Sequence, residues 1–160
     1  MTTQSFRQIL ETLEAHGVEY VVVGGVAAVL QGAPVTTFDI DTLVKVDPEN
    51  SRRLLNALAE LDARFREHDS LRPSAADLAA GGHMLLLTRS GPLDVLGFIG
   101  GGKRYEDIAD RTEYVRIGNL SIRVLTLQAL LEEKRALGRD KDLPVVRILE
   151  ALVARRKRDS

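Results

Sequence analysis

Residues 18–46 read VEYVVVGGVAAVLQGAPVTTFDIDTLVKV, and the centre of the predicted fold follows from them. Its opening β-branched run, ended by Gly24 and Gly25, predicts a buried strand. Residues 26–31 are expected to form a short helix, and residues 38–46 a second strand. The predicted centre of the molecule is therefore a strand, a short helix and a second strand that carries acidic side chains.

The segments on either side of this centre predict further helices and strands. An apolar stripe at helical spacing runs through residues 6–13, and Asp47-Pro48 is suited to cap and begin a helix. Strands are expected at residues 83–88, 92–99, 114–117 and 121–125, and helices at 74–80, 126–137 and 143–156. With no internal repeat and no linker, this order predicts one α/β (α+β) domain over residues 1–160. Its mixed β-sheet is flanked by helices, and its C-terminal end is helical.

Composition excludes several kinds of protein. Cysteine is absent, which rules out a disulfide scaffold, a thiolate metal site and a cysteine nucleophile. No segment approaches the roughly 20 apolar residues of a membrane span. The N-terminus lacks an apolar signal-peptide core, so we expect no membrane association and a cytoplasmic location. The basic run at residues 155–158 predicts a solvated helix end, with contact to RNA phosphates as the alternative.

Asp39 and Asp41 are the first candidate site residues. Side chains two apart on a strand project from the same face, so both carboxylates are expected on one face, with Phe38 and Ile40 on the other. Adjacent carboxylates repel each other unless a cation lies between them. Hard oxygen ligands suit Mg²⁺ or Mn²⁺, so the pair predicts a metal site. A solvated acidic pair without function is the alternative.

Asp94 interrupts the apolar strand PLDVLGF and is the candidate third carboxylate. Beside a metal pair, such a group can bind an ion and accept the proton of an attacking hydroxyl. The alternative is that Asp94 only caps the turn at Gly91-Pro92. The apolar residues around it favour the functional interpretation, because they indicate that the strand has already begun.

Gly24, Gly25 and Lys134 are candidates for binding phosphate. Backbone amides at the start of a helix can hold phosphate, and glycine permits its close approach. Lys134 interrupts the apolar stripe of its own helix, so its ammonium group either extends past the core edge or reaches the acidic site or the phosphates. Asp142 is interpreted first as a helix N-cap, with a role in the site second.

Two other features are interpreted as non-functional. Residues 100–103, Gly-Gly-Gly-Lys, lack the spacing of a P-loop and predict a mobile connection. The three histidines show no ligand spacing, and His83 is expected to lie away from the site.

These residues together resemble a known family. The stretch GGVAAVLQGAPVTTFDIDTLV resembles motif I of the DNA-polymerase-β-type nucleotidyltransferases. LDVLGFIGGGKRYEDI and LTLQALLEEKRALGRDKDL resemble downstream blocks of small bacterial members, including AbiEii-type toxins. The resemblance covers residues 18–152 and implies a nucleotidyltransferase-like fold. This chain differs from many members of the family at Gly25, where they carry serine, and in the length of the segment 26–38.

The resemblance implies a role for each candidate residue. The metal ligands would be Asp39, Asp41 and Asp94, and the triphosphate would be bound by Gly24, Gly25 and Lys134. One Mg²⁺ or Mn²⁺ ion would be held by Asp39 and Asp41, and a second would be shared with Asp94.

The implied reaction transfers a nucleoside monophosphate from an NTP, such as ATP, to an acceptor hydroxyl on RNA, protein or a small molecule, and releases pyrophosphate. A toxin–antitoxin partner is a further expectation. The first alternative is a non-catalytic nucleotide- or partner-binding module of the same fold, antitoxin-like or regulatory. The second is an Asp-x-Asp glycosyltransferase that binds a nucleotide sugar through Mn²⁺.

Overall fold

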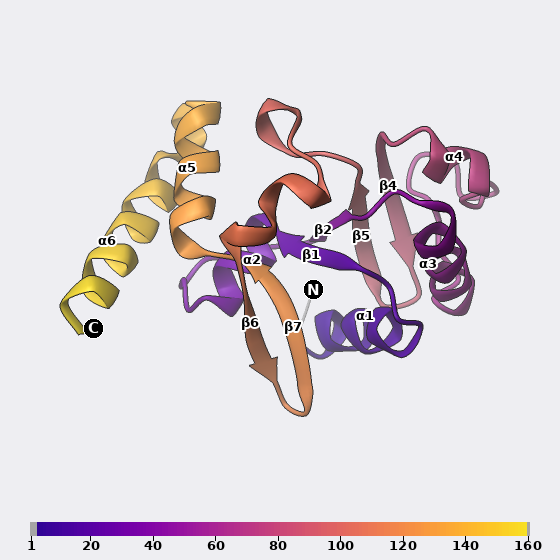
Figure 1. The fold of residues 1–160 in the computed structure, drawn as a ribbon, viewed down its shortest axis with the longest axis horizontal. Coiled ribbons are helices and arrows are strands. Elements are labelled where there is room, and N and C mark those ends of the chain that lie inside the picture. Colours follow the sequence, from indigo (N-terminus) through magenta and orange to yellow (C-terminus); the bar gives the residue numbers. More distant parts are fainter. Residues whose placement is uncertain (1–2, 160) are drawn as a thin grey trace.

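A seven-stranded mixed β-sheet forms the centre of the fold, and helices pack against it (Figure 1). The computed structural model describes residues 3–159. The strands are β1 (Tyr20–Val23), β2 (Ile40–Val44), β3 (Arg64–Phe65), β4 (His83–Thr88), β5 (Gly91–Leu96), β6 (Thr112–Ile117) and β7 (Leu120–Leu125). The α-helices are α1 (Thr3–Ala15), α2 (Gly24–Leu30), α3 (Pro48–Glu60), α4 (Ala75–Ala79), α5 (Leu127–Leu137) and α6 (Leu143–Asp159). Short 3₁₀ turns cover Gly100–Gly102, Tyr105–Arg111 and Asp140–Asp142.

The strand order is β3-β4-β5-β2-β1-β7-β6, and within residues 3–159 the sheet combines four antiparallel strand pairs with two parallel ones. Strand β2 runs antiparallel to β1 and parallel to β5, and β1 runs parallel to β7. The helical C-terminal end is formed by α5 and α6, which pack against each other (Figure 1). The predicted fold class, a mixed sheet flanked by helices with a helical end, is confirmed.

The core forms where apolar stripes of helices meet buried strands. All four residues of β1 are buried, as expected for a central β-branched strand. Ile9 and Leu10 of α1 are almost completely buried, as are Leu54 and Leu58 of α3, and the two helices contact each other. The helical spacing of these side chains explains why α1 and α3 fold against the sheet.

Asp47 and Pro48 begin α3 as predicted. The Asp47 carboxylate accepts a hydrogen bond from the backbone N–H of Asn50 at 2.7 Å, and Pro48 is the first helical residue. Buried Asn50 donates to the carbonyl oxygens of Glu19 and Lys45, at 3.0 and 2.7 Å. Helix α3 is therefore held at the end of the β1–β2 pair where residue 19 precedes β1 and residue 45 follows β2.

Strand β4 has one covered face and one open face. Met84, Leu86 and Thr88 are buried, whereas the alternate residues are exposed. Leu85 on the exposed face pairs in register with Asp94 of β5. Directly paired residues point to the same face, so the open face of β4 continues toward Asp94.

Among residues 3–159, no helix combines the length and the apolar character that crossing a membrane requires.

Candidate functional site

Three carboxylates meet where β2 and β5 run side by side. Asp41 pairs in register with Asp94 across the parallel strands, so both side chains leave the same face of the sheet. Asp39 lies directly before the first residue of β2. One carboxylate oxygen from each of Asp39, Asp41 and Asp94 lies within 4.8 Å of the others. The structure thus brings together the three acidic residues singled out from the sequence.

The start of β2 differs from the prediction. The strand was expected from residue 38, with Phe38 turned with Ile40 away from the acidic face. Instead β2 begins at Ile40, which is fully buried, whereas Phe38 is 70% exposed. The pairing of β2 with β5 begins at Ile40, and its pairing with β1 reaches only Asp41, where β1 ends. Phe38 therefore has no neighbouring strand to pack beside.

Burial and mutual repulsion raise the pKa of two of these carboxyls. Burial raises the pKa of Asp41 to about 8, together with the hydrogen bond and charge of Asp94 and the charge of Asp39, while Lys134 opposes the shift. Burial and Asp94 also raise the pKa of Asp39, with Arg66 opposing. Three ionised carboxylates in this position are costly, and a bound cation would relieve that cost.

Arg66 is a component of the site that the sequence did not indicate. Its Nη2 donates a hydrogen bond of 2.7 Å to Asp94 Oδ1 and another of 3.0 Å to the carbonyl oxygen of Leu86. Its Nη1 lies 3.9 Å from Asp39 Oδ2. Arg66 follows the two-residue strand β3, which is too short to show a periodic pattern.

Gly24 and Gly25 begin α2 directly beside the carboxylates. Gly24 has a φ of +67°, and a Cβ there would collide with the Asp41 carboxylate. A Cβ at Gly25 would lie 2.6 Å from Thr37 Oγ1. A Cβ at either position would therefore displace a neighbouring side chain, and at Gly24 it would also strain the left-handed backbone. Val23 is the N-cap residue of α2, and its side chain accepts no hydrogen bond from the backbone N–H groups of the first helical turn.

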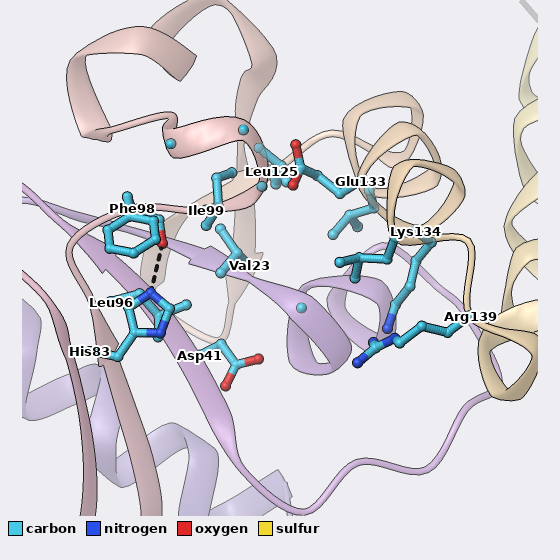
Figure 2. A pocket seen from close by; sticks show the side chains of 16 residues that line it. Val23, Asp41, His83, Leu96, Phe98, Ile99, Leu125, Glu133, Lys134 and Arg139 are labelled. Carbon is cyan, nitrogen blue, oxygen red and sulfur yellow. Dashed lines mark hydrogen bonds between the residues drawn. The ribbon is translucent and has the colours of Figure 1, made fainter.

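A cavity of about 430 Å³ opens beside Asp41 (Figure 2). Gly24 and Asp41 form one wall, the segment from Phe98 to Gly102 a second, and α5 a third. His83 also lines this cavity, so the expectation that it lies away from the site was wrong. Its ring lies 4.6 Å from that of Phe98, and its Nε2 is 3.2 Å from the Phe98 carbonyl oxygen. His83 lies there because it pairs with Leu96 when β4 and β5 align. The spacing of histidines along the sequence contains no information about this pairing.

The connection at residues 100–103 is fastened to α5, unlike the mobile segment that was predicted. It forms a 3₁₀ turn closed by a β-bridge between Ile99 and Lys103. Lys103 Nζ donates a 2.8 Å hydrogen bond to Glu133 Oε1. A Cβ at Gly100 would lie 2.6 Å from Glu133 Oε2, so this glycine lets the turn approach the helix.

Two basic side chains enter the cavity from the side opposite Asp41 (Figure 2). Lys134 Nζ lies 3.4 Å from Asp142 Oδ1, and Arg139 Nε donates a 2.6 Å hydrogen bond to Asp142 Oδ2. Burial opposes ionisation of Asp142, but the hydrogen bond of Arg139 and the charge of Lys134 keep its pKa below the ordinary value. Asp142 lies in the 3₁₀ turn before α6, where it holds these two cations.

Comparison with known proteins supports the fold. No protein-family profile matches the sequence, and no curated protein matches it. Among solved structures, a provisionally assigned nucleotidyltransferase from Thermotoga maritima is similar, with a TM-score of 0.58 and 21% sequence identity. The alignment covers 90% of this chain and 89% of that protein. The chain therefore has a nucleotidyltransferase-like fold. The finer resemblance to AbiEii-type proteins stays a prediction.

Proposed function

We propose that this protein is a divalent-metal-dependent nucleotidyltransferase. It transfers a nucleoside monophosphate from an NTP to an acceptor hydroxyl and releases pyrophosphate. The observation that carries the proposal is the meeting of Asp39, Asp41 and Asp94 within 4.8 Å, next to a cavity with two basic side chains. The fold shared with a provisionally assigned nucleotidyltransferase supports it.

The donor set of the carboxylate triad, Asp39, Asp41 and Asp94, fits Mg²⁺ or Mn²⁺. Each residue offers a hard carboxylate oxygen, and the pKa of Asp41 is raised by burial and then by its carboxylate neighbours, an unfavourable setting for ionised carboxylates that a divalent ion would relieve. Bound there, such an ion supplies electrostatic stabilisation of the triphosphate and a lowered pKa for the acceptor hydroxyl.

The residues around the triad bind and orient the nucleotide. Lys134 and Arg139 place two positive charges opposite Asp41, where they attract the triphosphate. The first-turn amides at Gly24 and Gly25 are a second phosphate contact, reached without a Cβ in the way. The apolar walls of the cavity, which include Phe98, exclude water from the nucleoside.

In the proposed reaction, the acceptor oxygen forms a bond to the α-phosphorus as the bond to the bridging oxygen breaks. Pyrophosphate leaves with the electron pair of that bond. The proton of the acceptor hydroxyl passes to a carboxylate, for which Asp94 is the candidate. RNA ends, protein hydroxyls and small molecules are the acceptor classes to be assayed.

A transfer assay with α-labelled ATP, CTP, GTP and UTP tests the proposal. We expect label on an acceptor from the wild-type protein with Mg²⁺ or Mn²⁺, and background label from Asp39→Asn and Asp41→Asn. Asp62→Asn is a matched control, because Asp62 is an exposed carboxylate that pairs with Arg72. Wild-type transfer by either triad variant would contradict the assignment.

A non-catalytic nucleotide- or partner-binding module, antitoxin-like or regulatory, is the second candidate function. The observation that favours it is the Arg66–Asp94 ion pair, which already engages the third carboxylate. Calorimetry with each NTP and Mg²⁺ separates the two functions. NTP binding without transfer to any acceptor class would support the module.

A further inference from the structure

Arg66 places a permanent positive charge beside the carboxylate triad. Its guanidinium donates to Asp94 at 2.7 Å and lies 3.9 Å from the Asp39 carboxylate. An arginine side chain does not lose its proton at any pH at which proteins are studied. Unlike lysine or histidine, Arg66 is therefore a fixed cation at this position.

The position of Arg66 is set by strand β4 as well as by the carboxylates. Its Nη2 also donates to the carbonyl oxygen of Leu86 at 3.0 Å. Its backbone N–H donates to the carbonyl oxygen of Leu85 at 3.0 Å, which continues the pairing of β3 with β4. The Leu86 carbonyl therefore holds the guanidinium independently of the charge on the carboxylates, and the Leu85 carbonyl holds the Arg66 backbone beside β4.

The triad is consequently divided between two sides. Arg66 lies 2.7 Å from the Asp94 carboxylate and 3.9 Å from that of Asp39, whereas Lys134, on the far side of the cavity from Asp41, pairs with Asp142 at 3.4 Å. Asp41 faces the cavity, and Asp94 is 13% exposed in the pair with Arg66. One side of the triad thus has a protein cation paired with its carboxylates, and the other side opens toward the cavity, whose cations Lys134 and Arg139 pair with Asp142 instead.

We propose that Arg66 is a resident cation that takes one of two cation positions at the triad. The wild-type chain then binds one divalent ion fewer than the same chain without this charge. Formal charges agree with this division, since the guanidinium and one divalent ion balance three carboxylates. The inference rests on the proposed function, because it takes the triad as the metal site.

Counting bound Mn²⁺ tests this directly. Free Mn²⁺ is measured by electron paramagnetic resonance during titration of the nucleotide-free protein, for wild type, Arg66→Gln and Arg66→Lys. We expect Arg66→Gln to bind one more ion per chain than wild type, and Arg66→Lys to bind the wild-type number, because lysine restores the charge. Arg72→Gln is the matched control, since it removes an exposed arginine that pairs with Asp62.

Melting temperatures measured without metal and with Mn²⁺ are a second, independent test. Removal of the guanidinium leaves the carboxylates without their partner, so Arg66→Gln should melt below wild type, and Mn²⁺ should raise its melting temperature more than that of wild type. Arg66→Met replaces Arg66→Gln if the glutamine variant fails to fold.

Equal numbers of bound ions in Arg66→Gln and wild type, including none in either, would overturn the assignment. An extra ion in Arg72→Gln would overturn it as well, because the effect would then be general electrostatics. Failure of the proposed function is seen separately: the wild-type protein would bind Mn²⁺ but transfer no label from any NTP.

Discussion

Replacing Gly24 with alanine tests how closely α2 positions the Asp41 carboxylate. The new methyl group would lie 3.2 Å from Asp41 Cγ and 3.3 Å from Asp41 Cβ, and it would collide with Oδ2. The backbone of Gly24 has a φ of +67°, a region that residues with a Cβ rarely adopt. The variant therefore combines backbone strain with displacement of a proposed metal ligand.

The two effects can be separated by a matched glycine. Gly17 has almost the same φ, +68°, but a Cβ there would meet only Arg53 atoms, the nearest at 3.9 Å. The left-handed backbone costs about 1–2 kcal/mol at either position. At about 2–4 °C per kcal/mol for a chain of this size, the strain lowers the melting temperature by roughly 2–8 °C. Gly24→Ala should lose more than Gly17→Ala, because Asp41 must also move.

Melting curves, Mn²⁺ titration and the transfer assay measure the difference. We expect Gly17→Ala to keep wild-type Mn²⁺ affinity and transfer, and Gly24→Ala to lose at least about tenfold in both. If Gly24→Ala melts like Gly17→Ala and binds Mn²⁺ as tightly as wild type, the contact between α2 and Asp41 does not position the carboxylate.

Three further predictions concern charge and packing around the site. In EDTA the melting temperature should fall between pH 4 and pH 8 more steeply in wild type than in Asp41→Asn. The reason is that the Asp41 pKa rises from 3.8 in the unfolded chain to about 8 on folding, so the folded state holds a proton that the unfolded state has released. Added Mg²⁺ should reduce that fall in wild type, as a pH series of melting curves would show. Asp142→Asn should weaken NTP binding about tenfold or more in calorimetry, because Lys134 loses its buried partner, while the number of bound Mn²⁺ ions stays the same. Gly97→Ala should lower the free energy of unfolding by about 1–3 kcal/mol or more, because its Cβ would collide with the backbone of Gly81, and melting curves should therefore show a larger fall in melting temperature than for Gly17→Ala.

Local patterns were sufficient to predict the central elements. Strand β1, helix α2 and the cap of α3 follow from a β-branched run, two glycines and Asp47-Pro48, all of which act within a few residues. The closeness of Asp39 and Asp41 also follows from their separation along one segment. Asp94 could only be proposed, because its place beside Asp41 depends on the non-local pairing of β2 with β5.

The other components of the site depend on contacts that leave no local pattern. Arg66 reaches Asp94 because the two-residue strand β3 pairs with β4. His83 reaches the cavity through its register with Leu96. Phe38 was assigned to β2 because alternation alone does not show where a partner strand ends. In each case the tertiary pairing of strands, not residue spacing, decided the outcome.

The proposed metal and nucleotide site is tested most directly by a crystal structure with a non-hydrolysable NTP analogue and Mg²⁺. We predict Mg²⁺ bound by the carboxylates of Asp39, Asp41 and Asp94, with the triphosphate between this ion and Lys134. A triphosphate bound elsewhere, or bound in the cavity with no metal on these carboxylates, would contradict the proposed nucleotidyltransferase site.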